Sequence, residues 1–317
     1  MSQKCKAFLR VAQKKMKVRD KMKMLVTGGT GFIGSNLALE LEKQGHDVVV
    51  VNNVNSKNKD NLKGFKGKII EKDISYPFEI DGKFDVIFHE AAISDPRFED
   101  DDEMIRTNVE GFKNIIQSAI KKNAKLIYAS TASLYGNGPI PMKEDQKKEL
   151  LSAYAKSKLA MDNLAEKYFD KMHIVGLRYF NVYGKNEASK GRPASMIYHL
   201  GKQMKEGKRP RIFKYGEHKR DHIYIKDAVT ATIKAVNAKK SGIYNVGTGI
   251  ATSFNDIVKI LNDVLGTSFE PEYADNPYKG TYQNNTQADT TNAEKYLGFK
   301  ARWALRQGIE DYKEEIE

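Results

Sequence analysis

Thr27-Gly-Gly-Thr-Gly-Phe-Ile-Gly34 follows a short apolar strand, and an amphipathic helix begins within it. Glycines in such a turn let the backbone approach a pyrophosphate group, and the helix start offers unpaired N–H groups to it. The flanks fit this function, because a leucine-rich helix leads to a second apolar strand at residues 47–51. The sequence therefore predicts a dinucleotide-binding turn that contains Gly28, Gly31 and Gly34.

Short β-branched segments alternate with helical ones over the first part of the chain. Strands are expected at 47–51, 68–70, 86–88, 125–128 and 174–177, and helices at 32–44, 103–121 and 154–169. Repeated βα units of this kind form a doubly wound parallel sheet. After residue 178 the pattern fades into short strands, at 211–213 and 242–246, and aromatic loops. We expect an α/β protein with a Rossmann-like dinucleotide-binding domain at 23–178 and a smaller, mainly substrate-binding portion at 179–317.

The positive charge of the chain is concentrated at its start. The formal net charge is +12, and +8 of it lies in residues 1–23. A nucleic-acid binder needs basic residues over its folded body, so no nucleic-acid partner is expected. Residues 1–22 are interpreted as a disordered basic extension; contact of this segment with an anionic surface or a partner is the alternative.

Other bulk features restrict the class of protein. The single cysteine, Cys5, excludes an internal disulfide and is typical of the reducing cytoplasm. No apolar run approaches the ~18 residues of a membrane helix, and the basic segment lacks the apolar stretch of a signal peptide. The six histidines show no metal-ligand spacing, so no metal site is expected.

Tyr154-Ala-Lys-Ser-Lys158 is the second chemical signature. A tyrosine and a lysine four residues apart share one face of a helix. The same spacing occurs elsewhere in this lysine-rich chain, at 198/202, 215/219 and 296/300. Only Tyr154 follows a strand that ends in Ser130-Thr131, and ligands of doubly wound sheets lie beyond such strand ends. We therefore expect Thr131, Tyr154 and Lys158 to converge on one site.

A tyrosine can act as a base at neutral pH only if its pKa is lowered. Moving the pKa from ~10 to ~7 requires about 4 kcal/mol in favour of the phenolate. One ammonium at ~4 Å supplies roughly that amount at an effective dielectric constant near 20. We expect Lys158 to lower the pKa of Tyr154 in this way, while Thr131 holds the substrate hydroxyl.

Together these motifs resemble the extended short-chain dehydrogenases/reductases that act on nucleotide sugars, over residues 24 to about 312. Within this superfamily the chain resembles the family of ADP-L-glycero-D-manno-heptose 6-epimerases. The segments that carry this resemblance are 88–94, 176–184, 190–191, 194–196 and 219–221, and most of all Gly280-Thr-Tyr-Gln283 with Thr286-Gln-Ala-Asp289. It implies a homo-oligomeric isomerase of lipopolysaccharide-precursor synthesis, which inverts C6 through a transient 6-keto sugar.

The resemblance also implies roles for individual residues. Besides the glycines, the cofactor side would include Phe32, Ile33, Asn52, Asn53, Lys59, Glu90, Ala91, Ala92, Ile93, Ser94, Asn108, Lys158 and Val182. The nucleotide sugar would be held by Asn181, Arg192, His199, Phe213, Arg220 and Tyr282. Lys190 would be a second acid/base opposite Tyr154.

Two positions depart from the family pattern. Arg192 replaces a residue that is often a small serine, which weakens the assignment of that substrate contact. Asn52 replaces a common aspartate, and a site that prefers NAD normally presents an acidic side chain to the ribose there. With Lys57 and Lys59 nearby to meet a 2′-phosphate, the sequence favours NADP over NAD.

Three other functions compete with this interpretation. A UDP-sugar 4-epimerase is the main alternative. A 4,6-dehydratase fits less well, because Ala132-Ser133 follows Thr131 where those enzymes place Asp-Glu. A non-catalytic nucleotide sensor on the same fold would usually lack the Tyr154/Lys158 pair.

Overall fold

The computed structural model describes residues 21–53, 58–77, 79–95, 98–278, 280 and 282–316. The expected basic extension therefore lies outside the described residues, apart from its last two. Lys57, expected near the cofactor ribose, also lies outside them.

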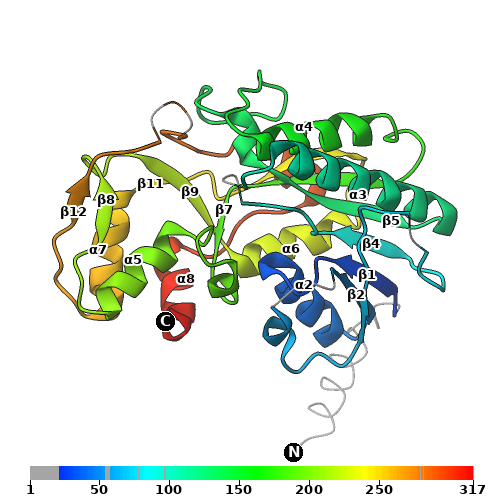
Figure 1. Cartoon of the computed structure of the whole chain (residues 1–317), viewed down its shortest axis with the longest axis horizontal. Helices are drawn as coiled ribbons and strands as arrows, with labels where there is room; N and C mark the ends of the chain where they lie inside the picture. Colours follow the sequence, from blue (N-terminus) through cyan, green and yellow to red (C-terminus); the bar gives the residue numbers. More distant parts are fainter. Residues whose placement is uncertain are drawn as a thin grey trace, which may run out of the picture.

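A seven-stranded, all-parallel sheet forms the centre of the molecule (Figure 1). From edge to edge its strands are β10 (Gly242–Val246), β6 (Ile174–Tyr179), β5 (Lys125–Thr131), β4 (Val86–His89), β1 (Lys23–Thr27), β2 (Asp47–Asn52) and β3 (Lys68–Glu71). The strands expected from the sequence are all present, and the predicted doubly wound sheet is confirmed.

The strand order reverses between β1 and β4. From β1 the chain builds outward through β2 to β3, then crosses over to β4 and builds the other half of the sheet. Ligands of such sheets bind beyond the carboxyl ends of the strands at this reversal. The glycine turn after β1 and the loop after β4 lie there, since Thr27 is paired with His89 at the ends of the two strands.

Helices cover both faces of the sheet (Figure 1). α3 (Asp101–Lys122) and α4 (Ala153–Glu166) pack on one face, and α2 (Phe32–Lys43) and α6 (Ile225–Ala235) pack on the other. Successive residues of β1 alternate between the two cores: Leu25 belongs to the α3–α4 side, whereas Met24 and Val26 belong to the α2–α6 side. This two-sided burial explains the uninterrupted apolar runs of the strands.

The smaller portion contains two short sheets and three helices beside the central sheet (Figure 1). Its elements are β7 (Asn181–Tyr183), β9 (Lys219–Tyr224) and β11 (Ala251–Ser253) in one sheet, β8 (Arg211–Phe213) and β12 (Glu272–Ala274) in the other, and α5 (Met196–Lys205), α7 (Phe254–Leu265) and α8 (Leu305–Tyr312). Short helical turns complete the fold: η1 (Lys59–Leu62), η2 (Ala132–Tyr135), η3 (Glu187–Lys190), η4 (Ala293–Leu297) and η5 (Lys313–Glu315). Within the described ranges, no helix has the length and apolar character needed to cross a membrane.

Candidate active site

A cavity of about 1400 Å³ lies at the carboxyl ends of the central strands and extends to the smaller portion. It brings together nearly all of the residues that the sequence analysis selected. Its lining includes Gly28, Gly31, Phe32, Ile33, Gly34, Asn52, Asn53, Glu90, Ala91, Ala92, Ile93, Ser94, Asn108, Thr131, Tyr154, Lys158, Asn181, Val182, Lys190, Arg192, His199, Phe213, Arg220 and Tyr282.

The glycine turn leaves no room for a side chain at Gly28 or Gly34. Gly28 has a φ of +68°, and a Cβ atom on it would lie 2.6 Å from the backbone nitrogen of Ala91. A Cβ on Gly34 would lie 2.3 Å from the carbonyl oxygen of Gly28. Gly31 is the N-cap of α2, so the open end of that helix faces the cavity. This close-packed turn at a helix N-terminus fits the pyrophosphate of a dinucleotide.

Asn108 fixes the loop after β4 against α4. Its Oδ1 accepts a hydrogen bond from the Ile93 N–H at 2.8 Å, and its Nδ2 donates to the Ile93 carbonyl at 3.0 Å. The same amide nitrogen donates to Ser157 Oγ on α4 at 3.0 Å. Asn108 therefore positions both the cofactor loop and the helix that carries the Tyr/Lys pair.

Tyr154, Lys158 and Thr131 do converge, as the sequence analysis predicted. Ser152 caps α4 by accepting from the Ala155 N–H, which places Tyr154 in the first turn of the helix. Lys158 is buried, its Nζ donates to the Ala129 carbonyl at 2.8 Å, and it lies 5.9 Å from the centre of the Tyr154 ring. None of the three competing Tyr/Lys pairs lines this cavity.

The expected lowering of the Tyr154 pKa is wrong for the protein side chains on their own. Burial raises the pKa of Tyr154 to about 12, although its hydrogen bond to Thr131 acts in the opposite direction. Burial also lowers the pKa of Lys158 to about 8. Nearby, burial raises the pKa of Glu90 to about 7, while its hydrogen bond from Tyr179 acts against this. Desolvation of the phenol, with a smaller contribution from the charge of Glu90, thus sets the direction of the shift.

Lys190 lies in η3, beside the glycine turn. Its Nζ is 5.7 Å from the centre of the Phe32 ring. Burial lowers the pKa of Lys190, while Glu187 and Asp95 act to raise it. Glu187 holds the segment in place, because its carboxylate accepts from the N–H groups of Gly184 and Ser195, both at 2.9 Å.

An aromatic and cationic wall lines the outer part of the cavity. The Arg220 guanidinium lies 4.7 Å from the centre of the Tyr282 ring and donates to the carbonyls of Lys219 and Asn284, both at 3.0 Å. Phe213 meets Tyr282 edge to face at 5.5 Å. Such a wall can stack a base or sugar and attract a diphosphate.

Arg192 and His199 lie near this wall. Arg192 is exposed, and its Nη2 donates to the Tyr278 hydroxyl at 3.3 Å. His199 Nε2 donates to the Arg192 carbonyl at 3.2 Å.

On the side of the cavity expected to bind the adenosine ribose, the selected residues already have partners within the protein. Asn52 Nδ2 donates to the Asn53 carbonyl, and Asn53 Nδ2 donates to Asp73, both at 3.3 Å. Lys59, in contrast to the other selected residues, does not line the cavity; its ammonium is paired with Glu71 at the end of β3. Its predicted contact with the ribose would require that ion pair to open.

The sequence analysis missed several polar residues of the cavity wall, among them Asp73 and His222. Asp73 follows β3, where its place after a strand could have marked it. His222 lies two residues after Arg220 on β9, so the alternation of a strand could have placed both on one face.

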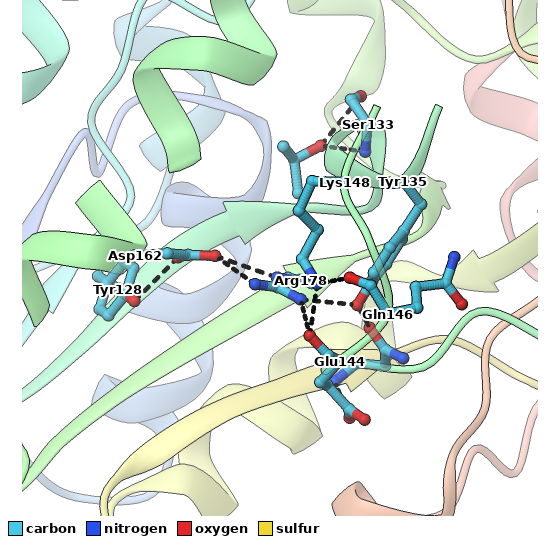
Figure 2. A network of polar contacts seen from close by, with 10 residues as sticks. Tyr128, Ser133, Tyr135, Glu144, Gln146, Lys148, Asp162 and Arg178 are labelled. Atoms are coloured by element: carbon cyan, nitrogen blue, oxygen red, sulfur yellow. Dashed lines mark hydrogen bonds and ion pairs between the residues drawn. The ribbon is translucent and has the colours of Figure 1, made fainter. Parts of the chain in front are cut away.

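Arg178 is at the centre of a buried polar network (Figure 2). Arg178 Nη1 donates to the Tyr135 hydroxyl at 3.0 Å and to the Glu144 carbonyl at 2.9 Å. The Tyr135 hydroxyl donates to Asn245 Oδ1 on β10 at 2.6 Å. The network thus joins β6 and β10 to the turn that follows Thr131.

In the described part of the chain, no group of three or more His, Cys, Asp or Glu side chains is placed to hold a metal ion. The absence of a metal from the mechanism stays a prediction.

Residues 24–247 match the sequence pattern of the NAD dependent epimerase/dehydratase family. The chain is 39% identical over 312 residues to the ADP-L-glycero-D-manno-heptose-6-epimerase of Brachyspira hyodysenteriae, a match that covers 93% of this chain and 98% of that protein. The crystal structure of the Helicobacter pylori ADP-L-glycero-D-manno-heptose-6-epimerase superposes with a TM-score of 0.86 at 36% identity, covering 95% of this chain and 99% of that one. The Bacillus cereus UDP-glucuronic acid 4-epimerase, solved with UDP-glucuronic acid and NAD, has a TM-score of 0.81 at 28% identity, with 93% and 99% covered.

Proposed function

The chain belongs to the NAD dependent epimerase/dehydratase family, and we propose that it is an isomerase that converts ADP-D-glycero-D-manno-heptose to ADP-L-glycero-D-manno-heptose. The observation that carries this proposal is the similarity to the Brachyspira protein of that name, which extends over almost the whole of both chains. The geometry supports it, because Tyr154, Thr131 and Lys190 line one cavity with an aromatic, cationic wall.

The proposed cofactor is NADP. A nicotinamide dinucleotide is supported by the family description and by the fit of the glycine turn. At the end of β2, Asn52 and Asn53 offer amides where an NAD site usually offers a carboxylate. The pairing of Lys59 with Glu71 means that this lysine would contribute only after changing partner.

The chemistry divides between the cofactor and the side chains. When bound, the nicotinamide supplies reversible hydride transfer at C6, by way of a 6-keto sugar that is reduced on its opposite face. Tyr154 would take or return the proton of the C6 hydroxyl, and Thr131, which hydrogen-bonds to Tyr154, would hold that hydroxyl against it. Lys158, fixed by the Ala129 carbonyl, stabilises the phenolate. Lys190 is the proposed second acid/base: once the 6-keto sugar presents its opposite face, its oxygen would take a proton from a second group.

The remaining residues would bind the nucleotide sugar. Arg220 and Tyr282 form a cation–π pair with Phe213 beside them, a surface suited to the nucleotide and diphosphate. Asn181, Arg192 and His199 complete the proposed substrate set. In this division, residues 23–178 mainly bind the cofactor and residues 179–317 mainly bind the substrate.

The oligomeric state and the cellular location of the enzyme are also proposals. We expect a homo-oligomer, which light scattering coupled to gel filtration would measure. The single cysteine is compatible with a cytoplasmic location.

A UDP-sugar 4-epimerase is the second candidate. It is favoured by the likeness to the Bacillus cereus UDP-glucuronic acid 4-epimerase, which covers 93% of this chain. Its lower identity, 28% against 39% for the Brachyspira protein, makes it the weaker proposal.

One experiment tests both candidates and the cofactor. The purified protein is incubated with ADP-D-glycero-D-manno-heptose, or with UDP-glucose, and the epimers are resolved by NMR. The protein is then denatured, and the released dinucleotide is identified by mass spectrometry. We expect epimerisation of the heptose only, with NADP released. Epimerisation of UDP-glucose alone would overturn the heptose proposal, and release of NAD alone would overturn the NADP proposal.

A further inference from the structure

His222 is a buried polar side chain in the cavity wall whose hydrogen-bonding capacity is unused. Its side chain is only 6% exposed. Neither ring nitrogen has a hydrogen-bond partner among the residues that the structure describes. Buried polar groups almost always have hydrogen-bond partners. The two nitrogens of His222 therefore point to a ligand that supplies such partners.

The strand register places His222 between two parts of the site. β9 runs parallel to β7, and His222 is paired in register with Asn181. Arg220 lies two residues earlier on the same face, about 7 Å away along the strand. Arg220 contacts Tyr282 in the outer wall, whereas Val182, next to Asn181, lies on the expected nicotinamide side. His222 therefore lies between the outer wall and the expected nicotinamide side, where the sugar of a bound nucleotide sugar would lie.

The charge state of the His222 ring indicates which type of ligand it can bind. Burial, and then the neighbouring Arg220, lower the pKa of His222 to about 3, so the ring is neutral at neutral pH. A neutral imidazole has one N–H donor and one acceptor nitrogen. A sugar hydroxyl both donates and accepts and so matches both nitrogens of the neutral ring, whereas diphosphate oxygens only accept and match the N–H alone.

We propose that His222 binds hydroxyl groups of the sugar moiety and so contributes to the choice of sugar. This rests on the proposed function as a nucleotide-sugar enzyme. His222 is then a specificity-determining contact, separate from the groups that move protons.

The test compares binding of a nucleotide sugar with binding of the nucleotide alone. His222→Phe keeps the ring, and with it the edge contact to Tyr183 at 6.2 Å, but removes both nitrogens. His222→Gln keeps one donor and one acceptor. His173→Phe is the matched control, because His173 precedes β6, hydrogen-bonds the Ala235 carbonyl and does not line the cavity. Calorimetry gives the Kd for ADP and for ADP-D-glycero-D-manno-heptose in a Tyr154→Phe background, which prevents turnover.

We expect His222→Phe to weaken binding of the ADP-sugar by about 3- to 10-fold, the value of one or two neutral hydrogen bonds, with ADP binding unchanged. His222→Gln should recover most of the loss, and His173→Phe should behave like the parent. With Tyr154 restored, KM should rise while kcat is retained. Melting temperatures and cofactor content confirm that the variants are folded.

Two outcomes overturn the proposal: unchanged binding of the ADP-sugar, or an equal loss for ADP and the ADP-sugar. If the parent protein binds no ADP-heptose, the proposed function fails separately. The role of His222 is then judged by the same comparison between UDP and UDP-glucose.

Discussion

Arg178 on β6 donates two hydrogen bonds to one carboxylate oxygen of Asp162 on α4, from Nε at 3.0 Å and from Nη2 at 2.9 Å. Both side chains are buried, and the second oxygen of Asp162 accepts from the Tyr128 hydroxyl at 2.9 Å (Figure 2). Asp162 lies one helical turn after Lys158. The pair therefore fixes α4, and with it Tyr154 and Lys158, against β5 and β6.

Replacing Asp162 by alanine is expected to destabilise the protein by about 3–5 kcal/mol, because it leaves the Arg178 charge buried without its counterion. Urea unfolding measures this difference. Glu110→Ala removes an exposed ion pair with Lys113 on α3 and should change stability by less than about 0.5 kcal/mol. A similar effect for both variants would contradict the anchoring role of the buried pair.

Tyr154→Phe keeps the ring but removes the atom that transfers the proton, so turnover should fall roughly 10²–10⁴-fold. Lys190→Met should be comparably damaging if two groups serve opposite faces of the sugar. Tyr296→Phe is the control, because Tyr296 packs on Tyr244 outside the cavity. Initial rates of epimerisation decide the matter, and near-normal activity of Tyr154→Phe would refute the assignment.

Glu90 should make stability depend on pH in a defined direction. Its pKa is raised from 4.5 to about 7 by burial, so its contribution is fully present below pH 4.5 and is lost as the pH rises through 7. Relative to Glu90→Gln, the wild-type unfolding free energy should therefore fall by up to roughly 3 kcal/mol between pH 4.5 and 8. Parallel urea titrations at several pH values measure the difference between the two proteins, which cancels the contributions of buried histidines. A constant difference would show that Glu90 does not titrate in this range.

Asn52→Asp should shift the cofactor preference toward NAD, because the added carboxylate binds the ribose 2′-hydroxyl and repels a 2′-phosphate. The ratio of the Kd values for NADP and NAD, measured on the stripped protein, reports the change. Lys59→Met provides a second test, since it should weaken NADP alone if this lysine leaves Glu71 to meet the phosphate. An unchanged ratio in Asn52→Asp would argue against this part of the site as the 2′-recognition element.

Epimerisation in D₂O should yield product without deuterium at C6. Direct proton removal needs an acidified C–H bond, whereas C6 of the heptose bears only a hydroxyl and neighbouring carbinol carbons, so the hydrogen at C6 should be retained within the site. Mass spectrometry and proton NMR of the product measure its isotopic content. Deuterium appearing at C6 in proportion to turnover would indicate enolisation instead.

Local pattern was sufficient to predict the sheet. The apolar segments that became β2 and β5 are short and bounded by polar or glycine positions, and the glycine turn predicted the position of the cavity. The position of a strand within the sheet was harder to predict from the sequence. The pairing of β10 with β6, for example, joins residues about 70 apart in sequence. Such long-range neighbours depend on packing rather than on local propensity.

In the candidate site, too, some features could be predicted from the local sequence, whereas others depend on how the chain folds. Thr131, the last residue of β5, was assigned to the cavity from its position at a strand end. The pKa of Tyr154 was mistaken, because the charge of Lys158 can be read from sequence whereas the desolvation of the phenol cannot. The ion pair of Lys59 could not be predicted for a related reason: its partner, Glu71, is twelve residues away and becomes a neighbour only when β3 joins the sheet.

The return of the chain to β10 limits how the molecule can be divided. If residues 23–178 were produced alone, the loss of β10 would leave β6 with an open row of N–H and C=O groups, and the loss of α6 would uncover one apolar face. An unprotected edge and face of this kind invite aggregation. The proposed cofactor-binding domain is therefore not a transferable module, and a gene fragment that ends near residue 178 should yield insoluble protein.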